Sequence, residues 1–135
     1  MSTLITNTFT GKTSAGSIVV TGEGGTNTTN LQQGLAKSWA NLNGTSTIAL
    51  RDSLNVSSIA DDGTGDYDFT YTTNFGNINY SISSHGSFTS TGAWATLNSA
   101  EEVPATNFHN YKMVDRNGSA QDATYAYYSA HGDLA

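Results

Sequence analysis

The stretch DDGTGDYDFTYTT, residues 61–73, predicts a tight turn followed by a β-strand. Tyr67, Phe69 and Tyr71 alternate with polar residues, and this period-two spacing places aromatic side chains on one face of a strand and polar ones on the other. The two glycines near the start of the stretch permit the positive φ angles of a turn. Because the preceding sequence SSIA can pair across this turn, the stretch is typical of a half-exposed antiparallel hairpin.

The three acidic residues of this turn raise the alternative of a cation site. A calcium-binding loop has oxygen ligands at its first, third and fifth positions, glycine at the sixth and a bidentate glutamate at the twelfth. Counted from Asp61, Asp66 stands in the place of the glycine and Thr72 in the place of the glutamate. The template fails and a plain turn is favoured, but a less usual site formed by Asp61, Asp62 and Asp66 stays open.

The same alternation recurs along the chain. Ile48, Leu50, Leu54 and Val56 share one face of a predicted strand, and Asp52 interrupts the series, which indicates a β-bulge or a place where that face meets water. The Asn-Gly pair in DRNG predicts a tight turn before the last strand. Further strands are expected at residues 4–9, 17–21, 67–72, 78–82, 111–113 and 123–134.

The composition favours one folded all-β domain. Thr (20), Ser (16), Asn (13) and Gly (14) make up nearly half of the 135 residues, and the 36% apolar residues include aromatic side chains in ordered alternation rather than scattered. A chain of this length can form one core but not two. We therefore expect an antiparallel β-sandwich, jelly-roll-like, with short strands before it.

The chain divides into two predicted parts. Residues 22–34, GEGGTNTTNLQQG, are too poor in apolar side chains to form a packed unit and have the composition of a linker. Residues 1–34 are thus expected to form an N-terminal arm and linker, and residues 35–135 a β-sandwich knob.

The charge balance excludes several partners. With 5 basic and 11 acidic residues and a net charge of −6, the chain lacks the basic stripe that nucleic acid binding needs. No apolar stretch is long enough to span a membrane, and the first residues have no signal-peptide pattern, so synthesis in the cytosol without membrane insertion is expected.

Catalytic and metal-binding patterns are weak. The chain has no cysteine, and His85, His109 and His131 do not have a metal-ligand spacing. Distant residues can assemble a Ser-His-Asp triad, but no G-x-S-x-G motif is present, and the adjacent Glu101 and Glu102 would point to opposite faces of a strand. We expect neither enzymatic activity nor a cofactor.

The two tryptophans allow different interpretations. Trp39 lies within a strand pattern, which favours packing in a core. Trp94 lies in residues 86–110, the least regular part of the chain, where one or two strands and a long loop near Pro104 are expected. For Trp94, packing and contact with a partner stay equally open.

Residues 36–73, AKSWANLNGTSTIALRDSLNVSSIADDGTGDYDFTYTT, resemble a module of tail-fibre-like and other virion proteins of marine tailed bacteriophages. The start MSTLITNTFTGKTSAGSIVVTG and the end YSAHGDLA are also similar to such proteins, whereas residues 86–110 are not. Leu42 and Asp52 depart from the family pattern, which has Phe and Ala there. The resemblance also favours a strand from Ala36 on, and we expect residues 31–40 to form a strand although Leu31, Leu35 and Trp39 have helical spacing.

The resemblance implies a β-rich structural protein of a phage virion, such as a small fibre, a head, neck or tail appendage, or a capsid decoration protein. It implies a homotrimer without cofactor or enzymatic activity, and three-fold assembly would cover apolar stripes too thin for one subunit. The N-terminal arm would dock on other virion proteins through added strands. The apolar side chains of the arm that would make this attachment are Leu4, Ile5, Phe9, Ile18 and Val19.

A second hypothesis is a receptor-binding module for glycans of the host surface. Its basis is the irregular aromatic segment at residues 88–111 together with a hydroxyl-rich surface. The candidate receptor contacts are Trp94, Phe108 and His109.

Overall fold

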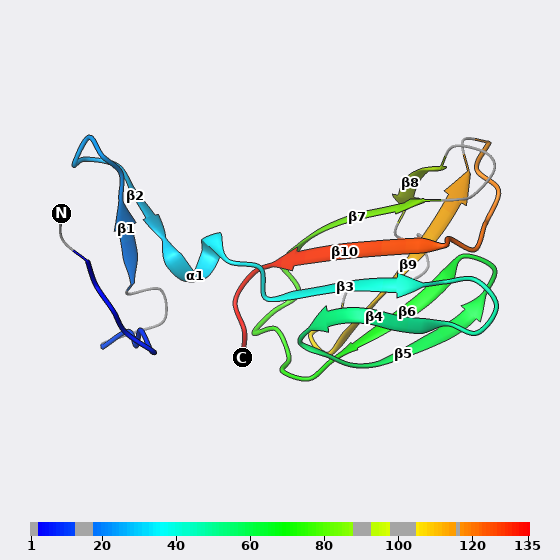
Figure 1. Cartoon of the computed structure of the whole chain (residues 1–135), viewed down its shortest axis with the longest axis horizontal. Helices are drawn as coiled ribbons and strands as arrows, with labels where there is room; N and C mark the ends of the chain where they lie inside the picture. The colour runs from blue at the N-terminus through cyan, green and yellow to red at the C-terminus, as the bar shows by residue number, and fades with distance from the viewer. Residues whose placement is uncertain (1–2, 13–17, 88–92, 98–104, 116) are drawn as a thin grey trace. The chain divides into compact units, whose positions relative to one another are not determined.

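A computed structural model of the chain describes residues 3–12, 18–87, 93–97, 105–115 and 117–135, with the backbone alone described for 93–97. The chain forms two compact units, Met1–Leu35 and Ala36–Ala135. Figure 1 shows the strands of both units and the short helix of the first.

The first unit is a small hairpin followed by one helical turn. Strand β1 (Val19–Thr21) pairs antiparallel with β2 (Thr28–Asn30), and α1 (Leu31–Gly34) follows directly. Asn30 caps this turn because its side-chain oxygen accepts a hydrogen bond of 3.1 Å from the backbone N–H of Gln33.

Three predictions for this part of the chain need correction. Residues 4–9 contain no strand, and residues 22–34 are more than a linker because they include β2 and α1. Residues 31–34 form a helical turn, so the strand expected at residues 31–40 begins only at Ser38. The expected strand at 17–21 is present at Val19–Thr21, and residue 17 lies outside the described residues.

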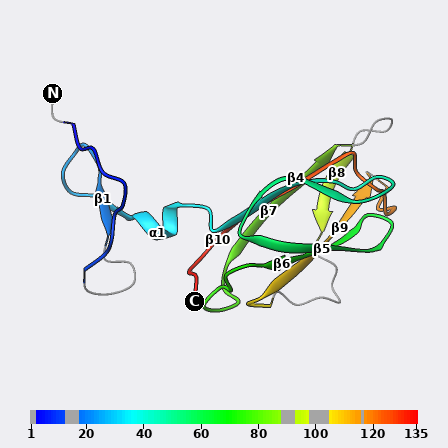
Figure 2. The same cartoon turned by 60° about the horizontal axis from the view of Figure 1, so that its bottom comes forward.

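The second unit consists of two antiparallel four-stranded sheets. The first has the strand order β4-β3-β10-β7 and the second the order β5-β6-β9-β8. Figure 2 shows β7 and β10 in one layer and β5, β6 and β9 in the other. The strands of the first sheet are β3 (Ser38–Asn43), β4 (Ala49–Leu54), β7 (Ser81–Ser87) and β10 (Tyr125–His131). Those of the second are β5 (Val56–Gly63), β6 (Asp66–Tyr71), β8 (Ala93–Leu97) and β9 (Phe108–Asp115).

The described chain is mostly β with antiparallel sheets, as predicted. Three pairs of sequential strands, β3–β4, β5–β6 and β8–β9, pair within one sheet. The other connections, β4–β5, β6–β7, β7–β8 and β9–β10, join strands of different sheets.

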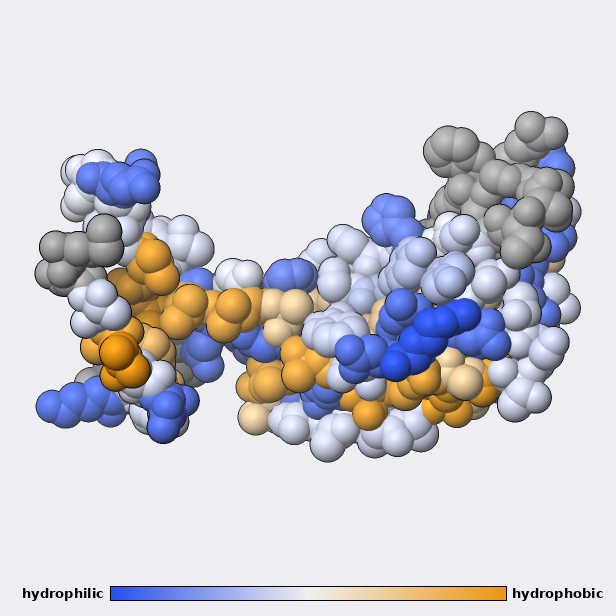
Figure 3. Space-filling model, in the orientation of Figure 1, coloured by the Kyte–Doolittle hydropathy of each residue, from blue (hydrophilic) through white to orange (hydrophobic). Residues whose placement is uncertain are grey.

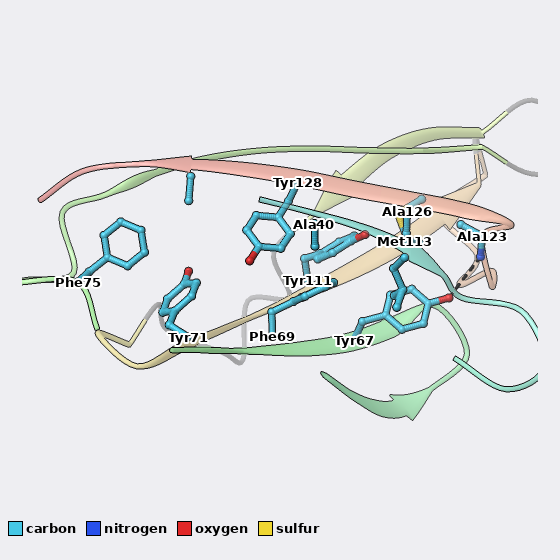
Figure 4. Close-up of a cluster of buried hydrophobic side chains, with 12 residues drawn as sticks. Ala40, Tyr67, Phe69, Tyr71, Phe75, Tyr111, Met113, Ala123, Ala126 and Tyr128 are labelled. Atoms are coloured by element: carbon cyan, nitrogen blue, oxygen red, sulfur yellow. Dashed lines mark hydrogen bonds between the residues drawn. The ribbon is translucent and has the colours of Figure 1, made fainter. Parts of the chain in front are cut away.

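Aromatic side chains fill the space between the two sheets (Figure 4). Phe69 of β6 stacks on Tyr111 of β9 at a centroid distance of 5.4 Å, and its ring meets that of Tyr128 of β10 edge-on at 4.7 Å. Phe69 and Tyr111 belong to the second sheet and Tyr128 to the first, and all three rings are nearly inaccessible to solvent. Residues whose side chains complete this core are Ala40, Leu42, Tyr67, Tyr71, Phe75, Met113, Ala123, Ala126 and Ala130. The unit therefore buries the aromatic stripes of β6 and β9 between its own two sheets.

The connection from β4 in the first sheet to β5 in the second is a single residue, Asn55. It lies between β4 and β5 and has a φ angle of 61°. Its side chain accepts a hydrogen bond of 2.7 Å from the backbone N–H of Thr73 and donates one of 2.9 Å to the carbonyl of the same residue. Asparagine tolerates this left-handed conformation better than most residues, so it fits the sharp bend.

A β-bulge in β4 explains the interruption at Asp52. Asn41 of β3 pairs with Asp52 while Leu42 pairs with Leu50, so Arg51 is the extra residue. The extra residue reverses the alternation beyond it, and Leu54 becomes 46% exposed on the outer face. The prediction of a bulge is confirmed, but the prediction that Leu54 shares the inner face of Leu50 is wrong.

Candidate functional site

The acidic hairpin forms as predicted, and two of its carboxylates, those of Asp61 and Asp66, accept hydrogen bonds within the protein. The turn joins β5 to β6, with positive φ angles at Gly63 and Gly65. Asp66 accepts a hydrogen bond of 2.6 Å from the side-chain amide of Asn110 and forms an ion pair of 3.1 Å with Lys112. Asp66 thus links β6 to β9 rather than facing the turn.

The remaining acids of the hairpin form no metal centre in the described structure. Burial raises the pKa of the Asp62 carboxyl group, and the neighbouring Asp68 raises it further, with smaller effects from Asp66 and Asp61. Asp61 accepts a hydrogen bond of 3.2 Å from the backbone N–H of Gly63, as in an Asx turn. Among the residues that the structure describes, no three His, Cys, Asp or Glu side chains are placed to hold a metal ion.

The three histidines differ in their exposure to solvent. His85 on β7 and His131 on β10 are exposed, whereas His109 is 1% exposed in the core. The Tyr71 hydroxyl lies 2.8 Å from Nδ1 of His109, and burial lowers the pKa of the His109 imidazole to about 3. The expectation that His109 contacts a receptor is therefore wrong, since its alternate position on β9 points it into the core.

The other predicted receptor contacts are only partly described. Phe108 begins β9 and is half-buried. Trp94 lies in β8, and its side chain is outside the described structure. Trp39, expected in the core, alternates with the buried Ser38 and Ala40 and lies on the outer face of β3.

The predicted attachment residues of the first unit are open to solvent. Leu4, Ile5 and Phe9 are 73%, 90% and 63% exposed, Val19 is also exposed, and Ile18 is half-buried. Across the described part of this unit, residues 3–12 and 18–35, no side chain is buried. Figure 3 shows apolar side chains at the surface of this unit.

Sequence reasoning missed a group of aromatic side chains on the outer surface of the first sheet, of which Tyr125 and Tyr127 are exposed and Trp39 is half-buried. We call this surface the aromatic face and define it by Trp39, Tyr125, Tyr127 and Arg51. Tyr125 and Tyr127 of β10 are 43% and 39% exposed, and their rings stack at a centroid distance of 6.4 Å. The adjacent tyrosines of TYAYYS carried the signal, because neighbouring residues of a strand must point to opposite faces.

Arg51, the bulged residue of β4, lies at the edge of the aromatic face. Its guanidinium carbon is 4.2 Å from the centre of the Tyr125 ring, a cation–π geometry. The same group donates hydrogen bonds to the carbonyl of Leu42 at 2.8 Å and to the side-chain oxygen of Asn43 at 3.3 Å. Three contacts thus fix its position beside the tyrosines.

Helices in the described part of the chain are too short and too polar to span a membrane. Comparisons with protein-family models, with curated proteins and with solved structures gave no match.

Proposed function

We propose that this chain is a structural component of a tailed-phage virion, with the first unit docking on the particle and the second exposed as a β-sandwich knob. The observation that carries the proposal is the contrast between the two units. The second unit encloses a core of its own, whereas the first leaves Leu4, Ile5 and Phe9 exposed and buries no described side chain. Exposed apolar side chains on so small a unit favour a partner that covers them.

Two further features support this role. The resemblance of residues 36–73 to fibre-like virion proteins names the class of particle. Strands β1 and β2 form a two-stranded ribbon, and such a ribbon offers its edges to strands of another protein. A homotrimer is part of the proposal, with several first units gathered at one attachment point.

Binding to purified particles of the phage that encodes the chain tests the proposal. The labelled full-length protein should co-sediment with particles, and Ile5→Asp with Phe9→Asp should reduce the bound fraction at least about tenfold, since each charge would be desolvated on docking. Ile78→Asp is the matched control, because Ile78 is an exposed apolar residue of the second unit at 50% exposure. Light scattering of the free protein should give three times the mass of one chain.

Absence of the protein from purified particles, detected by antibody and by mass spectrometry, would refute the proposal. A stable monomer that does co-sediment would refute only the trimer. The alternative receptor-binding role loses one of its three expected contacts, because His109 is buried.

A further inference from the structure

We infer that the aromatic face is a binding site for carboxylate-bearing saccharides. This site is distinct from Trp94, Phe108 and His109, and the inference does not depend on how the chain is mounted on a particle. It rests on the arrangement of side chains across the outer surface of the first sheet.

The sheet register brings polar and aromatic side chains into rows across its strands. Tyr127 pairs with Asn41 on one side and with His85 on the other, and Asn41 in turn pairs with Asp52. In the next row Ser129 pairs with Trp39 and with Ser83. Each aromatic ring is therefore flanked by groups that donate or accept hydrogen bonds.

The rings of Tyr125 and Tyr127 are stacked nearly parallel to each other. Tyr125 and Tyr127 follow each other at alternate positions of β10, and their planes differ by only 24°. Sugar rings expose C–H groups on one face, which pack on the electron-rich face of an aromatic ring, while their hydroxyls reach the surrounding polar groups. Aromatic rings flanked by polar side chains suit a saccharide better than an apolar protein segment.

Arg51 selects for negative charge. A guanidinium has five N–H donors, and those of Arg51 that do not bond Leu42 and Asn43 are free to pair with a carboxylate in the two-pronged geometry that arginine favours. The contact of Arg51 with Tyr125 holds the guanidinium on the aromatic face before any ligand binds, which reduces the entropy lost on binding.

The charge distribution also favours an acidic saccharide here. The chain has a net charge of −6, but four of its acids, Asp61, Asp62, Asp66 and Asp68, belong to the β5–β6 hairpin of the other sheet. The four strands of the first sheet, as described, contain one acidic residue, Asp52, next to Arg51 in β4. One arginine does not suffice for a nucleic acid, whose binding needs several neutralised phosphates.

The test uses the full-length chain on an array of uronate-bearing and sialate-bearing oligosaccharides printed beside neutral ones, followed by titration calorimetry with the strongest ligand. We expect binding to carboxylated saccharides, weakened about tenfold or more by Tyr127→Ala and largely retained by Tyr127→Phe, which keeps the ring. Arg51→Gln should remove the preference over neutral saccharides, and Arg51→Lys should restore it only in part, because lysine lacks the two-pronged geometry.

Matched controls separate these effects from general changes. Lys12→Gln removes one positive charge from the first unit, and Ile78→Ala truncates an exposed apolar side chain outside the aromatic face. Neither should change the affinity. Thermal unfolding of each variant checks that the fold is intact.

Three results would overturn the inference. One is no binding to any carboxylated saccharide, the second is equal affinity for neutral saccharides, and the third is self-association that Tyr127→Ala abolishes in light scattering. The last would assign the aromatic face to contacts between copies of the chain. None of these outcomes bears on docking to particles, so failure here and failure of the proposed function are distinguishable.

Discussion

The Tyr71 hydroxyl and Nδ1 of His109 lie 2.8 Å apart in the core between the two sheets. Phe69 stacks on the His109 ring at 5.2 Å, and the Tyr128 ring meets it edge-on at 4.3 Å. The second ring nitrogen, Nε2, is buried without a hydrogen-bond partner. A charged imidazole would be poorly solvated in this aromatic setting, so the fold requires neutral His109.

Acid should therefore destabilise the protein well above the range in which carboxylates titrate. Burial lowers the pKa of His109 to about 3, against an ordinary value of 6.5. The unfolded chain binds a proton below about pH 6.5 while the folded chain does not, so stability is greatest above that pH and falls as the pH drops toward 3. The free energy of unfolding, measured in urea, should fall by about 2 kcal/mol between pH 7 and pH 5.

Two variants isolate the histidine responsible. His109→Phe keeps an aromatic ring and should flatten the dependence between pH 7 and pH 5, although it leaves the Tyr71 hydroxyl without its partner. His85→Asn changes an exposed histidine and should leave the slope as it is in the parent protein. An unchanged slope in His109→Phe would contradict this account.

Gly65→Ala should be much more disruptive than Gly118→Ala. Both glycines have positive φ angles, 68° and 81°. A Cβ atom at Gly65 would lie 2.6 Å from the backbone oxygens of Met113 and Gln121, whereas one at Gly118 meets nothing within 4 Å. The free energy of unfolding, measured by chemical denaturation, should fall by about 1 kcal/mol in Gly118→Ala and by about 2 kcal/mol more than that in Gly65→Ala. Equal losses would mean that the backbone around Gly65 relaxes freely.

Asn55 should matter for both its backbone and its side chain. Asn55→Gly keeps access to the φ angle of 61° but removes the two hydrogen bonds to Thr73, which should cost about 1–2 kcal/mol. Asn55→Ala adds the left-handed strain and should cost about 1 kcal/mol more. The difference between the two variants in urea unfolding measures the strain directly, and a more stable alanine variant would show that the bend between β4 and β5 has moved.

Asp66→Ala should cost more than Lys112→Ala, although the two residues form one ion pair. Lys112 is partly exposed, and such pairs contribute about 0–1 kcal/mol. Asp66 also binds the side-chain amide of Asn110, which is buried, and its removal leaves a buried donor unpaired at a cost of about 1–3 kcal/mol. Thermal unfolding in low and high salt separates the two, because salt screens the contribution of Lys112 and not that of Asn110.

The sequence by itself determined the class of fold and several local features. Period-two spacing predicted the aromatic inner face of Tyr67, Phe69 and Tyr71, because alternation decides the faces of a strand whatever its neighbours are. The glycines of the acidic turn predicted the hairpin, and Asp52 predicted the bulge, since both depend on residues close in sequence. The helical turn at α1 was missed because the helical spacing of Leu31, Leu35 and Trp39 was outweighed by the resemblance, which favours a strand.

Only the tertiary structure decided which strands became neighbours and therefore what the surfaces contain. The pairing of β10 with β3 and β7 places Tyr127 between Asn41 and His85, residues more than forty positions apart in sequence. The pairing of β6 with β9 places Asp66 beside Lys112 and Asn110, and its carboxylate binds these side chains rather than a metal ion. Local sequence fixes which side chains share a face of one strand, but contacts between strands depend on the packing of the whole core, and that packing is a property of the complete chain.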